Sequence, residues 1–256
     1  MMHYQIDGQR GKPWLMFSNS LGTDMSMWDA QVEYLKDDFH ILRYDTRGHG
    51  GSPASPGPTT LAALGQDVLS LLDQLDIERV HFCGLSMGGA IAQWLGIHAP
   101  QRLDKLVIAN SAPRIGTQQG WLDRAAQVRE TGLDGVADGA AGRWFTPSFI
   151  AREPQRVASL VAKLRGGSPQ GYANCCDALA AADLRAGLSA ITTPTLLIAG
   201  AGDPVTTTSD AAAMREQIRD AIMVTLDASH ISNIEAAAAF NVALSDFLCG
   251  PPADTH

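Results

Sequence analysis

The chain has 256 residues, of which 45% are hydrophobic and 18% are charged, and its formal net charge at pH 7 is -8. This length and composition suit one large globular domain with a sizeable core. The negative charge would repel nucleic acids and anionic membranes at long range, so we expect neither as a partner.

The N-terminal segment MMHYQIDGQRGKP is polar and lacks the charged and then apolar order of a signal peptide. No apolar run in the sequence is long enough to span a bilayer. The four cysteines, Cys83, Cys175, Cys176 and Cys249, have no metal-ligand spacing, and an adjacent pair fits disulfide geometry poorly. We therefore expect a cytoplasmic protein with reduced, mostly buried thiols.

Short apolar runs alternate with longer helical patterns along the chain. The runs that predict strands are PWLMFS (13–18), FHILRYD (39–45), RVHFCG (79–84), KLVIANS (105–111), PTLLIAG (194–200) and AIMVTLD (221–227). Apolar residues at helical spacing and helix-favouring composition predict helices over Leu61–Leu75, Ala90–Ala99 and Ser232–Leu248. Such alternation is typical of βαβ units, so we predict an α/β fold with a mostly parallel central sheet flanked by helices.

The segment 114–188 interrupts this alternation of strands and helices, because it contains helix-like pieces such as GWLDRAAQVRE and PQRVASLVAKLR but no strand run. We predict that it forms a helical cap, and that residues 1–113 and 189–250 form one discontinuous core domain. The predicted cap has nine Lys and Arg against seven Asp and Glu, a net charge of +2, whereas the rest of the chain has a net charge of -10. A basic cap suits a small anionic ligand, although ordinary solvated surface charge explains the asymmetry equally well. The last six residues, PPADTH (251–256), should form a flexible tail.

One short motif has the pattern of a catalytic nucleophile. Gly84-Leu85-Ser86-Met87-Gly88 fits G-x-S-x-G, directly follows a predicted strand and precedes a predicted helix. This is the context of a nucleophile elbow, in which a sharp strand-to-helix turn exposes a serine hydroxyl. The flanking glycines suit such a turn, because a Cβ there would collide with neighbouring backbone. A plain glycine-rich turn before a helix is the structural alternative.

A serine nucleophile needs a general base and an acid that orients the base, and in this kind of fold they follow in the order Ser, Asp or Glu, His. His230 in LDASHISNIE stands between the last strand run and the final helix, so it is the expected base; His256 ends the chain. His49 in TRGHGGS precedes the serine, and we expect a structural role for it. Asp203 in IAGAGDPVT is the expected acid at the carboxyl edge of the sheet, with Asp227 as the alternative.

Acyl transfer also requires an oxyanion hole, normally formed by two backbone N–H groups. Met87, the residue after the nucleophile, is expected to supply one of them. Leu21 in FSNSLGTD is expected to supply the other from the loop after the first predicted strand, with Asn19 bracing that loop through its side-chain amide.

Several segments together resemble one group of α/β-hydrolases, the 3-oxoadipate enol-lactonases of aromatic catabolism. They are FSNSLGTD with a following MW, LRYDTRGHGGS, GLSMGG, RWFTPSF, GYANCCDALAAADLR and ASHISNIE, and they extend over nearly the whole chain. GLSMGG and RGHGGS are common to many hydrolases, whereas SNSLG, RWFTP and GYANCC are more specific. The resemblance implies the α/β-hydrolase fold with a helical cap, the triad Ser86, Asp203 and His230, and a small anionic lactone as substrate.

The implied reaction is lactone hydrolysis through an acyl-enzyme, which needs no metal or organic cofactor. The substrate carries a free carboxylate, and Arg143 in GRWFTP is the leading candidate to hold it among the eight arginines of the predicted cap. Trp144 either covers the lactone ring or anchors the cap. A carboxylesterase or a carbon-carbon bond hydrolase could use the same triad, whereas a complete triad argues against a non-catalytic ligand-binding protein. The sequence does not specify the oligomeric state and is compatible with a homo-oligomer.

Overall fold

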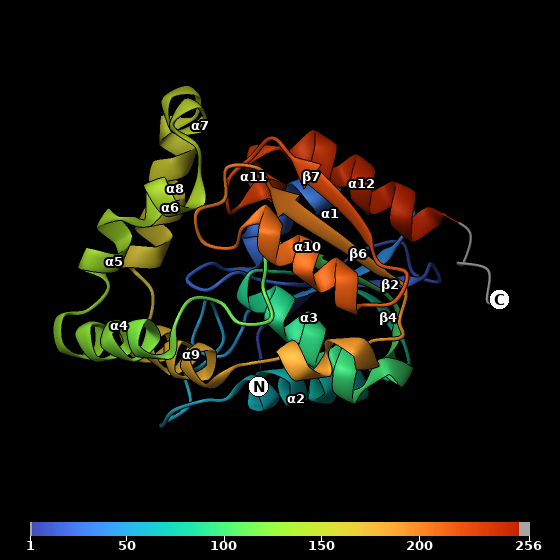
Figure 1. The fold of residues 1–256 in the computed structure, drawn as a ribbon, viewed down its shortest axis with the longest axis horizontal. Coiled ribbons are helices and arrows are strands. Elements are labelled where there is room, and N and C mark those ends of the chain that lie inside the picture. The colour runs from blue at the N-terminus through green and yellow to red at the C-terminus, as the bar shows by residue number, and fades with distance from the viewer. Residues whose placement is uncertain (1, 251–256) are drawn as a thin grey trace.

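A computed structural model describes residues 2–250, whose strands form one seven-stranded sheet (Figure 1). The strand order is β1-β3-β2-β4-β5-β6-β7; β1 pairs with β3 antiparallel, and every other neighbouring pair is parallel. The strands are β1 (Tyr4–Gly8), β2 (Trp14–Ser18), β3 (His40–Tyr44), β4 (Val80–Leu85), β5 (Leu103–Ala109), β6 (Thr195–Gly200) and β7 (Ile222–Leu226). The prediction of an α/β fold with a mostly parallel sheet is therefore confirmed.

The edge strand β1 lies in the N-terminal segment, where the apolar pattern predicts no strand. All five of its residues are exposed or half-buried, and Ile6 is 42% exposed, because β1 is covered less fully than the inner strands. An antiparallel edge strand can face water on one side, so it does not need a continuous apolar run. This is why hydrophobicity alone does not reveal it.

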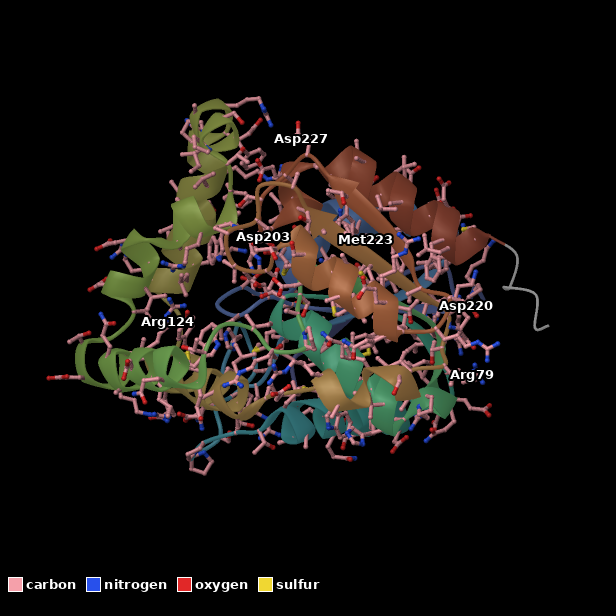
Figure 2. The ribbon with its side chains drawn as sticks, viewed as in Figure 1. Arg79, Arg124, Asp203, Asp220, Met223 and Asp227 are labelled. Carbon is pink, nitrogen blue, oxygen red and sulfur yellow. The ribbon has the colours of Figure 1, made fainter. Side chains whose placement is uncertain are left out.

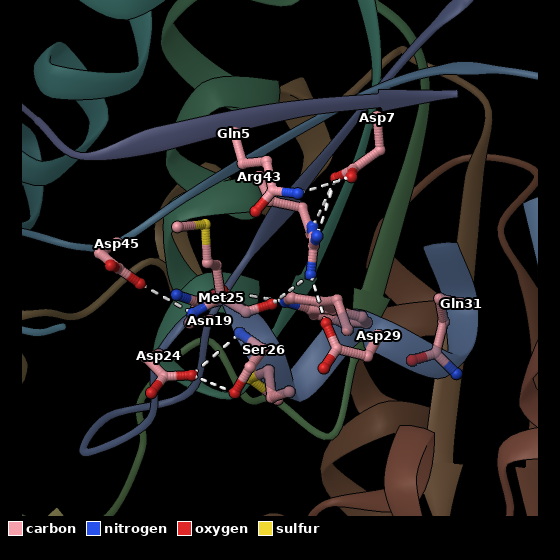
Figure 3. A network of polar contacts seen from close by, with 12 residues as sticks. Gln5, Asp7, Asn19, Asp24, Met25, Ser26, Asp29, Gln31, Arg43 and Asp45 are labelled. Atoms are coloured by element: carbon pink, nitrogen blue, oxygen red, sulfur yellow. Dashed lines mark hydrogen bonds and ion pairs between the residues drawn. The ribbon is translucent and has the colours of Figure 1, made fainter. Parts of the chain in front are cut away.

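A buried arginine ties this edge strand to the rest of the core (Figure 3). Arg43 on β3 is only 5% exposed, and its guanidinium donates to Asp7 Oδ2 on β1 at 2.9 Å and to Asp29 Oδ1 at 2.6 Å. The same group donates to the carbonyl of Met25 at 3.2 Å. One buried cation thus fixes β1, β3 and the segment that follows the first parallel strand of the sheet.

Helices cover both faces of the sheet (Figure 1). On one face α1 packs against α12, whereas α2, α3 and α10 lie on the other. The helices of this core are α1 (Asp29–Leu35), α2 (Leu61–Gln74), α3 (Met87–His98), α10 (Thr208–Gln217), α11 (Ser232–Glu235) and α12 (Ala237–Cys249), with 3-10 turns η1 (Met25–Trp28), η2 (Pro100–Arg102) and η3 (Arg185–Ala190). Among residues 2–250, every helix is too short or too polar to traverse a lipid bilayer.

Two predicted helices differ in extent from the observed ones. The helix expected from Ala90 starts already at Met87, because Gly88 and Gly89 allow its first turn to pack directly on β2 and on the end of β5; a Cβ on Gly88 would lie 2.2 Å from the carbonyl oxygen of Ser18. The helix expected over 232–248 is broken at Ala236 into α11 and α12. Polar side chains hold α11 in place separately, since Ser232 donates to Asn110 and Asn233 donates to the carbonyl of Met27.

The chain between β5 and β6 is helical and lies to one side of the sheet (Figure 1). It comprises α4 (Gln118–Thr131), α5 (Asp134–Asp138), α6 (Ala140–Trp144), α7 (Pro147–Arg152), α8 (Pro154–Arg165) and α9 (Pro169–Ala181). We call this group of helices the cap. α4 packs along α9, while α5, α6 and α7 pack against α8. η3 already packs on α3, so the chain has returned to the core by Arg185, slightly before the predicted cap boundary at residue 188.

The cysteines are free thiols, with Cys83, Cys175 and Cys176 buried and Cys249 exposed. Burial raises the pKa of both Cys175 and Cys176 to about 12, which keeps them protonated and unreactive. They therefore act as small apolar packing groups. The predicted flexible tail, 251–256, and His256 within it lie outside the described residues.

Candidate active site

The turn between β4 and α3 presents the predicted nucleophile. Ser86 has φ 59° and ψ -114°, a backbone conformation that non-glycine residues rarely adopt. A Cβ on Gly84 would lie 2.0 Å from the carbonyl oxygen of Gly88, and a Cβ on Gly88 would lie 2.2 Å from that of Ser18, so the close approach of α3 to β4 and β2 requires both glycines. The geometry is that of a nucleophile elbow, and the interpretation of these residues as a plain glycine turn is wrong.

The three predicted triad residues meet at the carboxyl edge of the sheet. His230 Nε2 lies 2.9 Å from Ser86 Oγ, and His230 Nδ1 lies 2.8 Å from Asp203 Oδ2. The carboxylate can only accept, so Nδ1 carries the proton and Nε2 is left to accept the serine proton. The side chains follow β4, β6 and β7, whose carboxyl ends coincide in a parallel sheet, and Figure 2 shows Asp203 at this end, facing the cap.

Asp203 is held by more groups than His230 alone. Its Oδ1 accepts the backbone N–H groups of Val205 and Thr206 at 2.8 and 3.1 Å. Its Oδ2 also accepts the Thr206 hydroxyl at 2.8 Å and the Asn110 amide at 3.0 Å. Burial acts to raise the pKa of this carboxyl, but the hydrogen bond and charge of His230, with the Asn110 and Thr206 donors, outweigh it and lower the pKa. Asp203 therefore stays ionised beside the imidazole.

Asn110 is a site residue that the sequence analysis does not identify. It directly follows β5 and has φ 43°, a left-handed conformation that asparagine tolerates better than most residues. Its amide donates to Asp203 Oδ2 and, at 3.1 Å, to the carbonyl oxygen of Ser229. It thus ties the acid to the loop that carries His230. The signal available was an asparagine directly after the strand run KLVIA, at the same sheet edge as the triad.

The two rejected candidates lie elsewhere. Asp227 is exposed at the end of β7 and is separated from Asp203 in Figure 2. His49 is buried, and its two ring nitrogens face the Gly22 N–H in the loop that carries Leu21 and the carbonyl oxygen of Arg47 rather than Ser86 or Asp203. The preference for Asp203 over Asp227 therefore agrees with the hydrogen bond between Asp203 and His230.

The two predicted oxyanion donors border the same space. Leu21 lines the cavity beside Ser86, and Met87 is the first residue of α3, whose N-terminal partial charge favours an anion there. Within the described range 2–250, neither of these two backbone N–H groups donates a hydrogen bond. The predicted brace is confirmed, because the Asn19 amide donates to the carbonyl of Tyr44 at 2.9 Å and its oxygen accepts from Trp28 Nε1 at 3.0 Å.

A cavity of about 320 Å³ opens between this edge of the sheet and the cap. Ser86 and His230 lie on its core side. The cap contributes both cations and aromatic rings: the lining includes Arg124, Arg143, Trp121, Trp144, Tyr172 and Leu164. Both residues predicted to contact the substrate, Arg143 and Trp144, therefore border the cavity that contains the serine.

The arginines of the cap differ in their partners. Arg129 pairs with Asp177, and Arg165 pairs with Asp134 and Asp138. Arg114 and Arg185, which flank the cap, pair with Asp183, whereas Arg152 and Arg156 are exposed to solvent. Arg143 donates instead to the carbonyl oxygen of Val136 at 2.6 Å, and Arg124 lies over the Trp121 ring at 5.1 Å. Among residues 2–250, no carboxylate lies within salt-bridge distance of either of these two. Burial lowers the pKa of Arg143, and the nearby positive charge of Arg124 lowers it further. The cavity is therefore lined by two cations that repel each other.

Arg124 was missed by the sequence analysis. Its segment, GWLDRAAQVRE, has the same mixed charge as the rest of the cap, and nothing local distinguishes it from Arg129. Its place in the cavity depends on how α4 packs on α9.

A serine on a strand-to-helix turn, with a histidine and a buried aspartate at the carboxyl edge of a mostly parallel sheet, defines the α/β-hydrolases. The model of the family described as "alpha/beta hydrolase fold" matches residues 13–237 of this chain. The chain belongs to this family and, within it, to the group of the 3-oxoadipate enol-lactonases, which its motifs resemble.

The particular relatives support that narrower placement. The chain is 49% identical to 3-oxoadipate enol-lactonase 2 of Acinetobacter baylyi and 45% identical to enol-lactonase 1 of that organism, over 95% of this chain and 91% of each relative. The solved enol-lactonase of Burkholderia xenovorans is 44% identical, with a TM-score of 0.95 over 97% of this chain and 96% of that one.

Proposed function

We propose that this chain hydrolyses 3-oxoadipate enol-lactone to 3-oxoadipate through an acyl-enzyme on Ser86. The observation that carries the proposal is the Ser-His-Asp arrangement at a cavity that is also lined by two arginines, neither of which has a carboxylate of residues 2–250 within salt-bridge distance. The similarity to proteins named 3-oxoadipate enol-lactonases supports the choice of lactone. The binding partner is then a small anionic metabolite.

In the first half of the reaction His230 Nε2 takes the proton of the Ser86 hydroxyl, and Oγ attacks the lactone carbonyl. The backbone N–H groups of Leu21 and Met87 stabilise the negative charge that develops on the carbonyl oxygen. Collapse of the tetrahedral intermediate breaks the ring C–O bond and expels the enol oxygen. The enolate leaves readily and, with the proton returned by His230, becomes the ketone of the product, which remains attached as an ester of Ser86.

In the second half a water molecule gives its proton to His230 and attacks the ester carbonyl. The same two N–H groups stabilise the second tetrahedral intermediate, and His230 returns the proton to Ser86 Oγ as the C–O bond breaks. Asp203 stays ionised throughout and stabilises the imidazolium formed in each half. The product 3-oxoadipate leaves with two carboxylates, one of them present from the start.

The carboxylate already present in the substrate needs a cation, and we propose Arg143, assisted by Arg124, for this role. Both arginines belong to the cap and line the cavity that Ser86 also lines. A carboxylate between them would relieve the repulsion that lowers the pKa of Arg143. Trp144 supplies an apolar wall for the ring, while its carbonyl oxygen accepts from Ile231 N at 3.0 Å and so links the cap to the His230 loop.

We also propose a cytoplasmic location, since the four free thiols suit a reducing compartment. Fractionation of cells producing the protein tests it, with recovery in a periplasmic or membrane fraction as the contrary result.

The decisive assay follows the loss of ultraviolet absorbance of freshly generated enol-lactone. Wild type, Ser86→Ala and a neutral aryl ester as second substrate are measured side by side. We expect wild type to consume the lactone with a much higher kcat/KM than the ester, and Ser86→Ala to consume neither. Cleavage of the ester alone would instead identify a carboxylesterase.

A further inference from the structure

The loop that carries the predicted oxyanion donor is a tight turn. Thr23 N–H donates to the carbonyl oxygen of Ser20 at 3.2 Å, and Gly22, at the third position, has φ +80°. A turn of this kind requires a positive φ there, which favours glycine. A Cβ on Gly22 would lie 2.7 Å from Leu164 Cδ1 in the cap, so this turn is also covered closely from outside.

His49, from the RGHGGS motif, lies directly behind this turn. The Gly22 N–H donates to His49 Nε2 at 3.0 Å, and His49 Nδ1 lies 3.3 Å from the carbonyl oxygen of Arg47. The imidazole is 7% exposed, and burial lowers its pKa. Since Nε2 accepts a hydrogen bond, the ring is neutral and carries its proton on Nδ1.

The backbone that holds His49 is itself fixed. A Cβ on Gly48 would lie 2.3 Å from the Cα of Gly171 in α9, so the two backbones are packed directly against each other. On the core side, Asp45 accepts the Gly51 N–H at 2.9 Å and the Met25 N–H at 2.8 Å, the second contact being visible in Figure 3. Asp45 thus joins the His49 loop to the segment that follows the oxyanion turn.

We propose that His49 is a positioning residue for the oxyanion hole. By accepting the Gly22 N–H, it holds the turn in the conformation that leaves the Leu21 N–H free for the substrate oxyanion. Without this acceptor the Gly22 N–H would be buried and unsatisfied, a state that favours rearrangement of the turn. The inference rests on the proposed acyl transfer at Ser86, but not on the identity of the ester.

The test compares His49→Leu, which removes the acceptor, with His49→Gln, whose amide oxygen can replace it. His81→Leu is the matched control, because His81 is a half-buried histidine on β4 remote from the turn. Each protein is assayed on a neutral aryl ester, and its inhibition by an aryl trifluoromethyl ketone, whose serine adduct carries an oxyanion, is measured in parallel.

For His49→Leu we expect kcat to fall roughly 10- to 100-fold with KM unchanged, because a donor is misplaced by a fraction of an ångström. Affinity for the trifluoromethyl ketone should fall by a similar factor, and His49→Gln should recover most of both losses. An unchanged kcat in His49→Leu, or equal impairment of the Leu and Gln variants, would overturn the proposal.

A second measurement does not depend on a variant that folds. Nitrogen-15 NMR of the histidine rings in wild-type protein at pH 7 should show His49 neutral and protonated on Nδ1, the rarer tautomer. A charged ring, or a proton on Nε2, would overturn the assignment. Ester hydrolysis that persists in Ser86→Ala would be a different failure: it would refute the proposed acyl-enzyme chemistry, and with it this role, while leaving the observed tautomer in place.

Discussion

The core and the cap meet at one cavity, but their polar groups there differ in how fully they are paired. On the core side Asp203 accepts hydrogen bonds from four different residues, and His230 is bonded through both ring nitrogens. On the cap side, within the described part of the chain, Arg124 and Arg143 border the cavity with no carboxylate at salt-bridge distance, whereas Arg129 and Arg165 are paired on the outside of the cap. The core is thus complete before substrate arrives, whereas the cap is electrostatically incomplete. This difference indicates that the core determines the chemistry and the cap selects the substrate.

The largest effect should come from the core. Ser86→Ala removes the nucleophile, and we expect kcat to fall roughly 10⁴- to 10⁶-fold on lactone and ester alike, since the triad acts as a unit. Progress curves at high enzyme concentration measure the residual rate. The melting temperature should not fall, because the substitution removes only a hydroxyl from a strained turn. A large loss on the lactone with the ester unaffected would contradict a shared nucleophile.

Asp203→Asn should rank next. The amide cannot stabilise the imidazolium and can favour the wrong tautomer of His230, so kcat should fall roughly 10³- to 10⁴-fold with little change in KM. Initial rates on both substrates measure this change. Asp227→Asn is the matched control, since that carboxylate is exposed and remote, and it should leave kcat unchanged.

Asp203→Asn also gives a prediction about how stability depends on pH. The pKa of Asp203 is lowered in the folded protein, so its carboxylate stabilises the fold above its ordinary pKa, and this contribution is lost as pH falls through the lowered value. The wild type should therefore exceed Asp203→Asn most in free energy of unfolding near neutral pH, and the difference should shrink below about pH 4. Urea unfolding across this range measures it; a difference that grows on acidification would have the wrong sign.

The cap should affect binding more than turnover. Arg143→Ala should raise KM for the lactone roughly 10- to 100-fold, the usual range for a charge-assisted hydrogen bond, while KM for a neutral ester is spared. Arg124→Ala should act in the same direction. Arg165→Ala, whose side chain pairs with Asp134 and Asp138 on the outside, is the control. Equal losses on lactone and ester would refute carboxylate binding by these arginines.

The sequence predicted the core side of the site far better than the cap side. Ser86, Asp203 and His230 each follow a recognisable strand run, and parallel strands bring their carboxyl ends together whatever the rest of the chain does. The bracing role of Asn19 was predictable for the same reason. The edge strand β1 was not predicted, because it is not buried on both faces and so lacks a continuous apolar run.

What was missed depends on contacts between distant segments. Asn110, which was not identified, donates to an acid 93 residues later. His49 was expected to be structural, but its partner, a turn that precedes it by 27 residues, was not foreseen. Arg124 and Arg129 lie one and a half turns apart on the same helix, yet one borders the cavity and the other pairs with Asp177. Helix packing decides between them, and no local pattern encodes it.

The smallest effect should come from the junction of the two regions, at Glu235 at the end of α11. Its carboxylate accepts the Ser229 N–H at 2.8 Å, next to His230, and also accepts the hydroxyl and N–H of Thr146 in the cap. Glu235→Gln keeps one acceptor oxygen but loses the charge, so we expect about 1–2 kcal/mol less stability and a melting temperature lower by a few degrees. Because this residue holds the His230 loop and the cap at once, kcat and KM should both change by only a few fold. A change confined to KM would mean that Glu235 orders the cap alone, and a change confined to kcat that it serves only the core.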